Sequence, residues 1–115
     1  MMKIENAFNV LSNQLELHDS SVEEMTLKNE ENTLQIDLRI ILSNKDRYLI
    51  KFLLVKEFGF YYSNNYFFYN IDEVKLLKVL DGYYISLDPD TTESGQSEMD
   101  QDFILCKDLE IYLCK

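Results

Sequence analysis

The stretch TLQIDLRIIL at residues 33–42 decides the fold class. Its Leu and Ile side chains fall at every second position from Leu34 to Leu42, and mostly polar residues stand between them. A period of two places alternate side chains on opposite faces of a β-strand, so this stretch predicts a strand with one buried face. Polar turn sequences flank it, NEEN at residues 29–32 and SNKDR at residues 43–47. Turns this short predict antiparallel pairing with the neighbouring strands.

Further strands are predicted outward from this one. Before it, from residue 20 onward, apolar and polar residues again alternate. After it, residues 48–55 are largely apolar on both faces, which is typical of a central strand covered on both sides. We expect one further strand at residues 56–62, with a bulge or bend at Gly59. Two more are expected at 73–80 and 83–87, around an Asp81-Gly82 hairpin turn. The last two are expected at 103–106 and 109–114, around a turn at Lys107-Asp108.

One helix is predicted, at residues 4–15. A stripe at helical spacing is formed by Ile4, Ala7, Phe8, Leu11 and Leu15. A helix this short must pack on something to persist. At 115 residues the chain suits one domain, residues 1–115. The expected fold is therefore α+β, mainly β, with an N-terminal helix packed on a bent antiparallel sheet or small sandwich of seven or eight strands.

The composition is strongly acidic, because 21 Asp and Glu against 11 Lys and Arg give a net charge of -10. Such a surface repels phosphate backbones, so no direct nucleic-acid binding is expected. No apolar run approaches the roughly 18 residues of a membrane span, and the N-terminus does not read as a secretory signal. The only cysteines are Cys106 and Cys114, which we expect to be reduced thiols. These features favour a cytoplasmic protein that does not bind membranes.

Most of the excess negative charge lies in two segments. Residues 16–31 hold six acidic residues and one Lys, and residues 88–102 hold six acidic residues and no Lys or Arg. The spacing of the acidic residues in the second segment is not that of an EF-hand. A weak ion site there is possible, but it is the less favoured interpretation of this segment. We expect a mobile, solvated loop that is kept open by self-repulsion and offers an acidic surface to a basic partner. The acidic rim is expected at Asp88, Asp90, Glu93, Glu98 and Asp100.

Aromatic residues are concentrated in FGFYYSNNYFFY, residues 58–69, which hold eight of the fifteen in the chain. In a strand about half of these side chains must point away from the core. For the group as a whole we favour core packing, in a sheet covered on both faces, over an exposed aromatic surface. The members expected to be exposed are Tyr61, Tyr62 and Tyr66, and exposed Tyr is favoured at protein interfaces.

His18 is the only histidine, and Asp19 follows it. His-Asp pairs occur in metal-dependent phosphohydrolases, but those sites need further His ligands, which this chain lacks. A lone His could also serve as a general base beside Asp19. The plainer interpretation is structural, with Asp19, Ser20 and Ser21 hydrogen-bonding the local backbone at the corner between helix and strand. We therefore expect no catalytic site, no metal and no cofactor.

A set of short motifs resembles a known group of proteins. The predicted helix is followed by Leu17-His18-Asp19-Ser20 and Val22-Glu23-Glu24-Met25, then by the alternating strand and the aromatic-rich strand, and the end reads DFILCKDLEI at residues 102–111. This pattern resembles small bacterial β-rich proteins that open with a His-Asp-Ser or His-Asp-Ala corner. Some of those proteins are grouped with polymorphic-toxin immunity proteins. The resemblance implies no catalytic role for the His-Asp corner.

The sequence thus favours a non-enzymatic, acidic protein-binding module, such as an immunity-like protein that occludes a basic toxin domain. Its anchors would be Tyr61, Tyr62 and Tyr66, and the acidic rim would steer the partner. Two alternatives stay open. One is a structural protein that forms a homodimer through the aromatic face or an open strand edge. The other is an enzyme or small-ligand protein with a pocket near His18.

Overall fold

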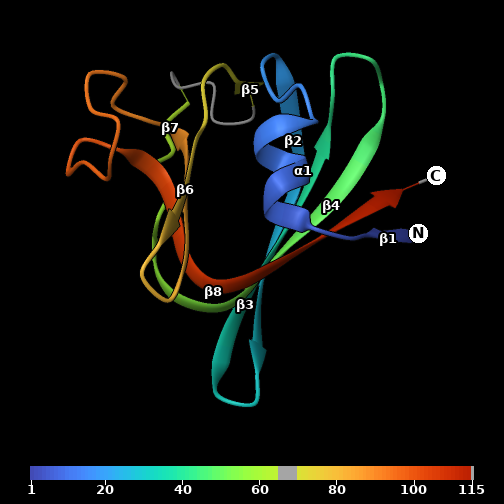
Figure 1. The fold of residues 1–115 in the computed structure, drawn as a ribbon, viewed down its shortest axis with the longest axis horizontal. Helices are drawn as coiled ribbons and strands as arrows, with labels where there is room; N and C mark the ends of the chain where they lie inside the picture. Colours follow the sequence, from blue (N-terminus) through green and yellow to red (C-terminus); the bar gives the residue numbers. More distant parts are fainter. Residues whose placement is uncertain (65–69, 115) are drawn as a thin grey trace.

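The computed structural model describes residues 1–64 and 70–114. Their strands form a curled antiparallel sheet in the order β5-β2-β3-β4-β8-β7-β6, and β1 adds to β8 beside this path (Figure 1). The elements are β1 (Met2–Ile4), α1 (Ala7–Asn13), β2 (Ser20–Glu30), β3 (Thr33–Ile41), β4 (Arg47–Gly59), β5 (Asn70–Ile71), β6 (Lys75–Val79), β7 (Gly82–Asp88) and β8 (Gln101–Cys114). The predicted fold class is confirmed: the protein is mainly β, with a bent antiparallel sheet and one N-terminal helix.

The alternating stretch at residues 33–42 forms β3, which lies at the centre of the sheet. Ile36, Leu38 and Ile40 are buried, while β2 and β4 pair with its two edges. β4 is covered on both faces, as predicted, because Leu49 is buried as well as Ile50. The structure joins the two predicted strands at residues 48–55 and 56–62 into one long β4.

The sheet curls because its two longest strands, β4 and β8, bend together (Figure 1). The bend in β4 lies at Leu54, which has φ 52°, and the register to β8 shifts between Val55 and Glu57. An extra residue in one strand of a pair produces such a bend. The prediction of a bend at Gly59 was therefore wrong by several residues.

The predicted turn at Lys107-Asp108 was also wrong. β8 runs through this point without a break, since Leu53 of β4 pairs with Asp108 and Val55 pairs with Cys106. The two polar side chains are exposed on the curved part of the strand. A polar pair between two apolar runs resembles a turn in sequence, but here the neighbouring strand supplies backbone partners on both sides of it.

The helix α1 is shorter than predicted and lies on the concave side of the sheet (Figure 1). Ile4 belongs to β1 and pairs with Ile111, and Asn6 turns the chain with a left-handed φ of 58° before the helix begins. Val10 and Leu11 are the buried residues of α1, and they join the sheet core. Within the described residues, no helix is long and apolar enough to span a membrane.

Candidate functional site

Tyr61 and Tyr62 follow the end of β4 and are exposed, as predicted, with 52% and 71% of their surface accessible. The backbone N–H of Tyr61 donates a hydrogen bond to Oδ1 of Asp102, at 2.8 Å. Asp102 lies in β8, two residues after Asp100 at the end of the acidic loop. The structure therefore brings Tyr61 beside the end of that loop, and Tyr62 follows it in the chain. Tyr66, the third predicted anchor, lies outside the described residues.

A close approach of β4 and β8 holds this corner together. A Cβ at Gly59 would come within 2.9 Å of the Phe103 ring, so the ring lies directly over the glycine backbone. The side chains of Phe58 and Phe60 form a tilted pair with ring centroids 5.6 Å apart. A shallow hollow of about 210 Å³ opens here, lined by Gly59, Phe60, Tyr61, Asp100, Gln101, Asp102 and Phe103.

Asp100, which the sequence analysis places on the acidic rim, is buried instead. Its Oδ1 accepts hydrogen bonds from Nζ of Lys75, at 2.9 Å, and from the backbone N–H of Asp90, at 2.8 Å. Its Oδ2 accepts from the Tyr84 hydroxyl, at 2.7 Å, and from the backbone N–H of Ser97, at 3.0 Å. We call these five residues the Asp100 node. Asp100 cannot meet a partner directly, because its side chain is wholly enclosed by these groups.

The charge of Asp100 is stabilised by its surroundings. Burial opposes its ionisation, but the hydrogen bonds from Lys75, Tyr84 and the two backbone N–H groups outweigh this and lower its pKa to about 2. Burial, together with the hydrogen bond to Asp100, raises the pKa of Tyr84. At neutral pH Asp100 is therefore a carboxylate, and the phenol of Tyr84 beside it is neutral.

The node gives the acidic loop, residues 89–100, a defined shape. Lys75 also donates to the carbonyl of Gly95, at 2.8 Å. Asp90 accepts from the Thr92 hydroxyl, at 2.6 Å, and from the Ser97 hydroxyl, at 2.8 Å, and these bonds lower its pKa. The loop is thus cross-linked by hydrogen bonds, which corrects the expectation that self-repulsion holds it open.

The predicted rim is therefore reduced to the carboxylates that remain accessible. Glu93 and Glu98 are exposed, whereas Asp88 and Asp90 are half-buried. Met99, with 73% of its surface accessible, adds an apolar side chain to the same loop.

The other acidic segment, residues 16–31, does not join this surface. Glu23 pairs with Arg47 at 3.1 Å, and Glu24 pairs with Arg39 at 3.3 Å. The tip of the β2–β3 hairpin, with Glu30 and Glu31, projects away from the end of the molecule that carries the acidic loop (Figure 1).

A second polar cluster surrounds His18, in the corner between α1 and β2. Its Nδ1 lies 2.7 Å from the backbone carbonyl of Asp72 and 3.3 Å from Oδ1 of the same residue. Its Nε2 lies 3.4 Å from Oδ2 of Asp19. The hydrogen bond to the Asp72 carbonyl and the charge of Asp19 raise the pKa of His18. All three side chains are exposed, and their ligand atoms are close enough to hold a metal ion.

Sequence reasoning missed Asp72 because it lies 54 positions from His18 along the chain. The contact depends on β5, which pairs with the first residues of β2. The adjacent hollow, of about 360 Å³, is lined by acidic and apolar side chains that include Glu16 and Glu73. This is the pocket near His18 that the sequence analysis keeps as an alternative.

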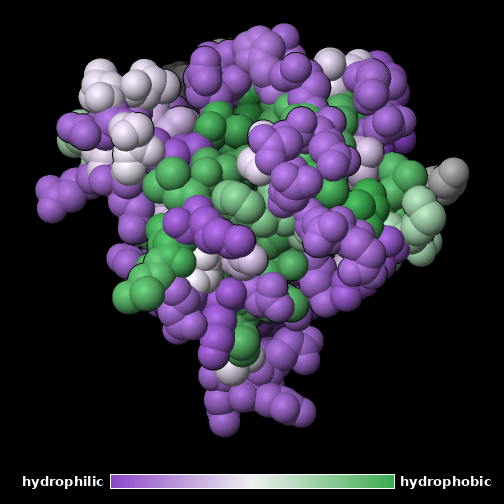
Figure 2. All heavy atoms as spheres, in the orientation of Figure 1, coloured by the Kyte–Doolittle hydropathy of each residue, from purple (hydrophilic) through white to green (hydrophobic). Residues whose placement is uncertain are grey.

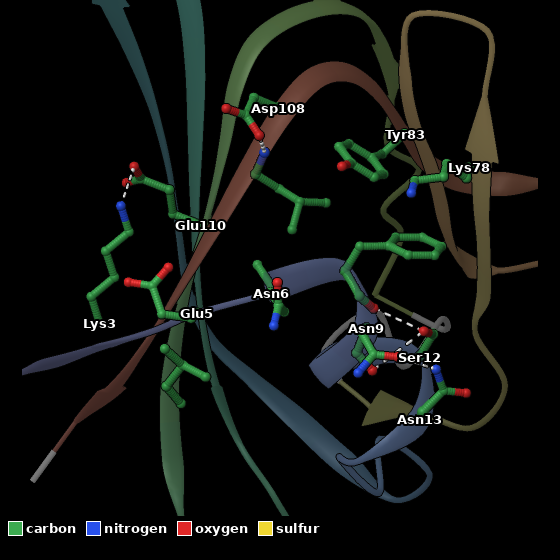
Figure 3. Close-up of a pocket in the computed structure, with 14 residues that line it drawn as sticks. Lys3, Glu5, Asn6, Asn9, Ser12, Asn13, Lys78, Tyr83, Asp108 and Glu110 are labelled. Atoms are coloured by element: carbon green, nitrogen blue, oxygen red, sulfur yellow. Dashed lines mark hydrogen bonds and ion pairs between the residues drawn. The ribbon is translucent and has the colours of Figure 1, made fainter.

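Another hollow, of about 690 Å³, lies between β1, α1, β6, β7 and β8 (Figure 3). Figure 2 shows hydrophobic residues across the middle of this face, with hydrophilic side chains around them. The ion pair between Lys3 and Glu110, at 3.2 Å, stands at one side of the hollow, and Phe8 stacks on Tyr83 at 5.1 Å. The side-chain amide of Asn13 donates a hydrogen bond to Oδ1 of Asn9, at 2.7 Å. These polar side chains of the hollow are therefore hydrogen-bonded or ion-paired to one another.

Comparison with protein-family models, with curated proteins and with solved structures finds no match.

Proposed function

We propose that this protein is a non-enzymatic binding module for a basic protein partner. Its docking surface consists of Tyr61, Tyr62 and the acidic loop at residues 89–100. The observation that carries the proposal is the hydrogen bond from Tyr61 to Asp102, which holds the first of two exposed tyrosines near Asp100, at the end of a shaped acidic loop.

Each part of the docking surface has its own physical role. Tyr side chains offer a large rigid contact area and a hydroxyl group at a small entropic cost, which suits them to anchor an interface. The exposed carboxylates of Glu93 and Glu98, on a protein with net charge -10, attract a basic partner and speed its encounter. The Asp100 node keeps the loop ordered before binding, so less entropy is lost when the partner docks.

A binding role is favoured over catalysis by the surroundings of His18. Its ring nitrogens face a carbonyl and carboxylates, and in the described part of the chain neither is hydrogen-bonded to a Ser or Cys side chain. A nucleophile held by a base is the arrangement that covalent catalysis requires.

The more specific form of the proposal is an immunity-like protein. Its partner would then be a basic toxin domain, and inhibition would follow from covering the surface through which that domain acts. The motif resemblance and the acidic docking surface support this form together.

The test is affinity capture from the source organism at physiological salt, with three forms of the full chain as bait. The double variant Tyr61→Ala/Tyr62→Ala removes the anchors. The control Glu30→Gln/Glu31→Gln changes two charges at the remote hairpin tip. We expect one basic protein on the wild type and on the control, with at least about tenfold less on the tyrosine variant.

The captured protein is then expressed alone and with each form. An immunity role predicts that it slows growth when alone and that the wild type, but not the tyrosine variant, restores growth. Equal capture by all three forms would show that the docking surface is wrongly placed. Capture without toxicity would leave the binding module but remove the immunity role.

A homodimer is the second candidate, and the open edge of β2 favours it. Among the described residues, only Ser20 and Ser21 of this strand have a partner on the side away from β3. Exposed edges of this kind can pair with another chain. Sedimentation velocity at micromolar concentration distinguishes the two, since the leading proposal predicts a monomer before the partner is added.

A further inference from the structure

We propose that His18, Asp19 and Asp72 form a binding site for a divalent transition-metal ion of the Zn²⁺ type. One ligand atom from each of these side chains lies within 4.8 Å of the other two. Imidazole nitrogen and carboxylate oxygen are ligands that Zn²⁺ takes in proteins, at about 2.0–2.2 Å from the metal. Three protein ligands leave one tetrahedral position for water or for a group from another molecule.

The hydrogen bonding of His18 leaves one nitrogen free for the metal. A carbonyl oxygen can only accept, so Nδ1 must carry the proton in its 2.7 Å contact with the backbone of Asp72. Nε2 then has its lone pair available and faces Oδ2 of Asp19 at 3.4 Å. Two ligands of a tetrahedral Zn²⁺ lie about 3.3 Å apart, so this pair needs little movement. A backbone carbonyl on the second nitrogen is also the usual way in which a metal-binding His is oriented.

The Asp72 carboxylate completes the site by a side-chain rotation. Its oxygen now lies near Nδ1, at 3.3 Å, and 76% of its side chain is exposed to solvent. An exposed side chain changes rotamer readily, so we infer that the carboxylate turns toward Nε2 when the metal binds.

The backbone that carries the three ligands is firmly held. Asp19 donates its N–H to the carbonyl of Ile71 at 2.8 Å, and Ser20 pairs with Ile71 in the sheet. Leu17, Ser20 and Ile71, the neighbours of the ligands in the chain, are all buried. Binding therefore orders mainly side chains, which lowers its entropic cost.

The electrostatics of the adjacent hollow favour a cation independently of the triad. Glu16 and Glu73 line this hollow together with Asp72, and no Lys or Arg is among its lining residues. The contrast with the Asp100 node is direct, because Lys75 already supplies the positive charge there. This inference goes beyond the proposed function and uses residues outside the docking surface.

The test is titration of the full chain with ZnCl₂ at pH 7.5, followed by proton NMR and calorimetry. His18 is the only histidine, so the imidazole signals report on this site alone. The variants His18→Ala, Asp19→Asn and Asp72→Asn each remove one ligand. Glu98→Gln makes a matched charge change in the acidic loop, and Cys114→Ser removes a partly accessible thiol that could bind zinc elsewhere.

We expect stoichiometric Zn²⁺ to shift the His18 signals in the wild type, in Glu98→Gln and in Cys114→Ser, and a chelator to reverse the shift. Each ligand variant should bind at least about tenfold more weakly, with an unchanged circular dichroism spectrum showing that it is folded. Unshifted imidazole signals in the wild type at tenfold excess of Zn²⁺ would overturn the site. So would equal affinity in Asp19→Asn, Asp72→Asn and the wild type.

Discussion

The Asp100 node and the His18 cluster are made of similar residues, but the node is buried and the cluster is exposed to solvent. Each joins a nitrogen-bearing side chain to a carboxylate from a distant segment of the chain. In the node, the side chains of Asp100 and Lys75 are 0% and 8% exposed, and all their polar atoms have partners. In the cluster, more than half of the His18 and Asp19 side chains is exposed. A buried carboxylate that is paired with a Lys of the same protein stabilises the fold. Exposed carboxylates that have no such Lys or Arg partner can instead bind a ligand from solution.

The energetic reason lies in desolvation. A buried charge is costly unless a partner and further hydrogen bonds replace its water, and Asp100 has both. Exposed charges keep their water, so the contacts in the His18 cluster contribute little to stability.

The largest expected effect is on the free energy of unfolding of Asp100→Asn. The substitution keeps the shape of the side chain but leaves the ammonium group of Lys75 buried without its anion, which should cost about 3 kcal/mol. The matched variant Asp19→Asn, in the exposed cluster, should change stability by no more than about 0.5 kcal/mol. Urea denaturation measures both. Similar losses in the two variants would remove the contrast between the clusters.

The next effect is the response to acid. The pKa of Asp100 is lowered from 3.8 to about 2, so the folded state holds the ionised form more tightly than the unfolded state does. Its contribution, about 2 kcal/mol, is complete above pH 4 and is lost as the pH falls toward 2. Chemical denaturation of the wild type between pH 5 and pH 2 should show this loss. In Asp100→Asn that part of the pH dependence should be missing, and an unchanged profile would contradict the assignment.

The smallest effect concerns two glycines, Gly59 at the end of β4 and Gly95 within the acidic loop. Gly59→Ala places a methyl group 2.9 Å from the Phe103 ring, which must shift, and we expect a loss of about 1 kcal/mol. Gly95→Ala is the control, because no atom lies within 4 Å of a Cβ at that position. Thermal denaturation distinguishes them: equal melting temperatures would mean that the β4–β8 corner is looser than described.

Much of the sheet could be predicted from the sequence, because burial on one face imposes a period of two. The alternation in β3 and the apolar faces of β4 are local signals, and so is the hairpin before β7, although its turn lies at Leu80-Asp81, one residue before the predicted Asp81-Gly82. The errors arose where distant segments pair. Ile4 fits the helical stripe but joins β1, because the edge of β8 at Ile111 is open to it. The Lys107-Asp108 pair resembles a turn in the sequence, but β4 pairs with β8 on both sides of it, so the strand continues.

The candidate sites were less predictable for the same reason. Asp100 is one of six similar acidic residues in its segment, and only contacts with Lys75 and Tyr84, on neighbouring strands, make it different. His18 and Asp19 could be noticed in the sequence, but Asp72 reaches them through β5. The exposure of Tyr61 and Tyr62 could be predicted from the sequence, because these residues lie where the alternating pattern of a strand ends.

The most direct test of this account is amide hydrogen exchange in the acidic loop, because the central structural claim is that one buried carboxylate shapes the proposed docking surface. The amides of Asp90 and Ser97 donate to Asp100, and that of Tyr61 donates to Asp102. We predict slow exchange at Asp90 and Ser97 in the wild type and in Asp19→Asn, and fast exchange at both in Asp100→Asn, with the β3 amides protected throughout. Fast exchange of both amides in the wild type would contradict the claim.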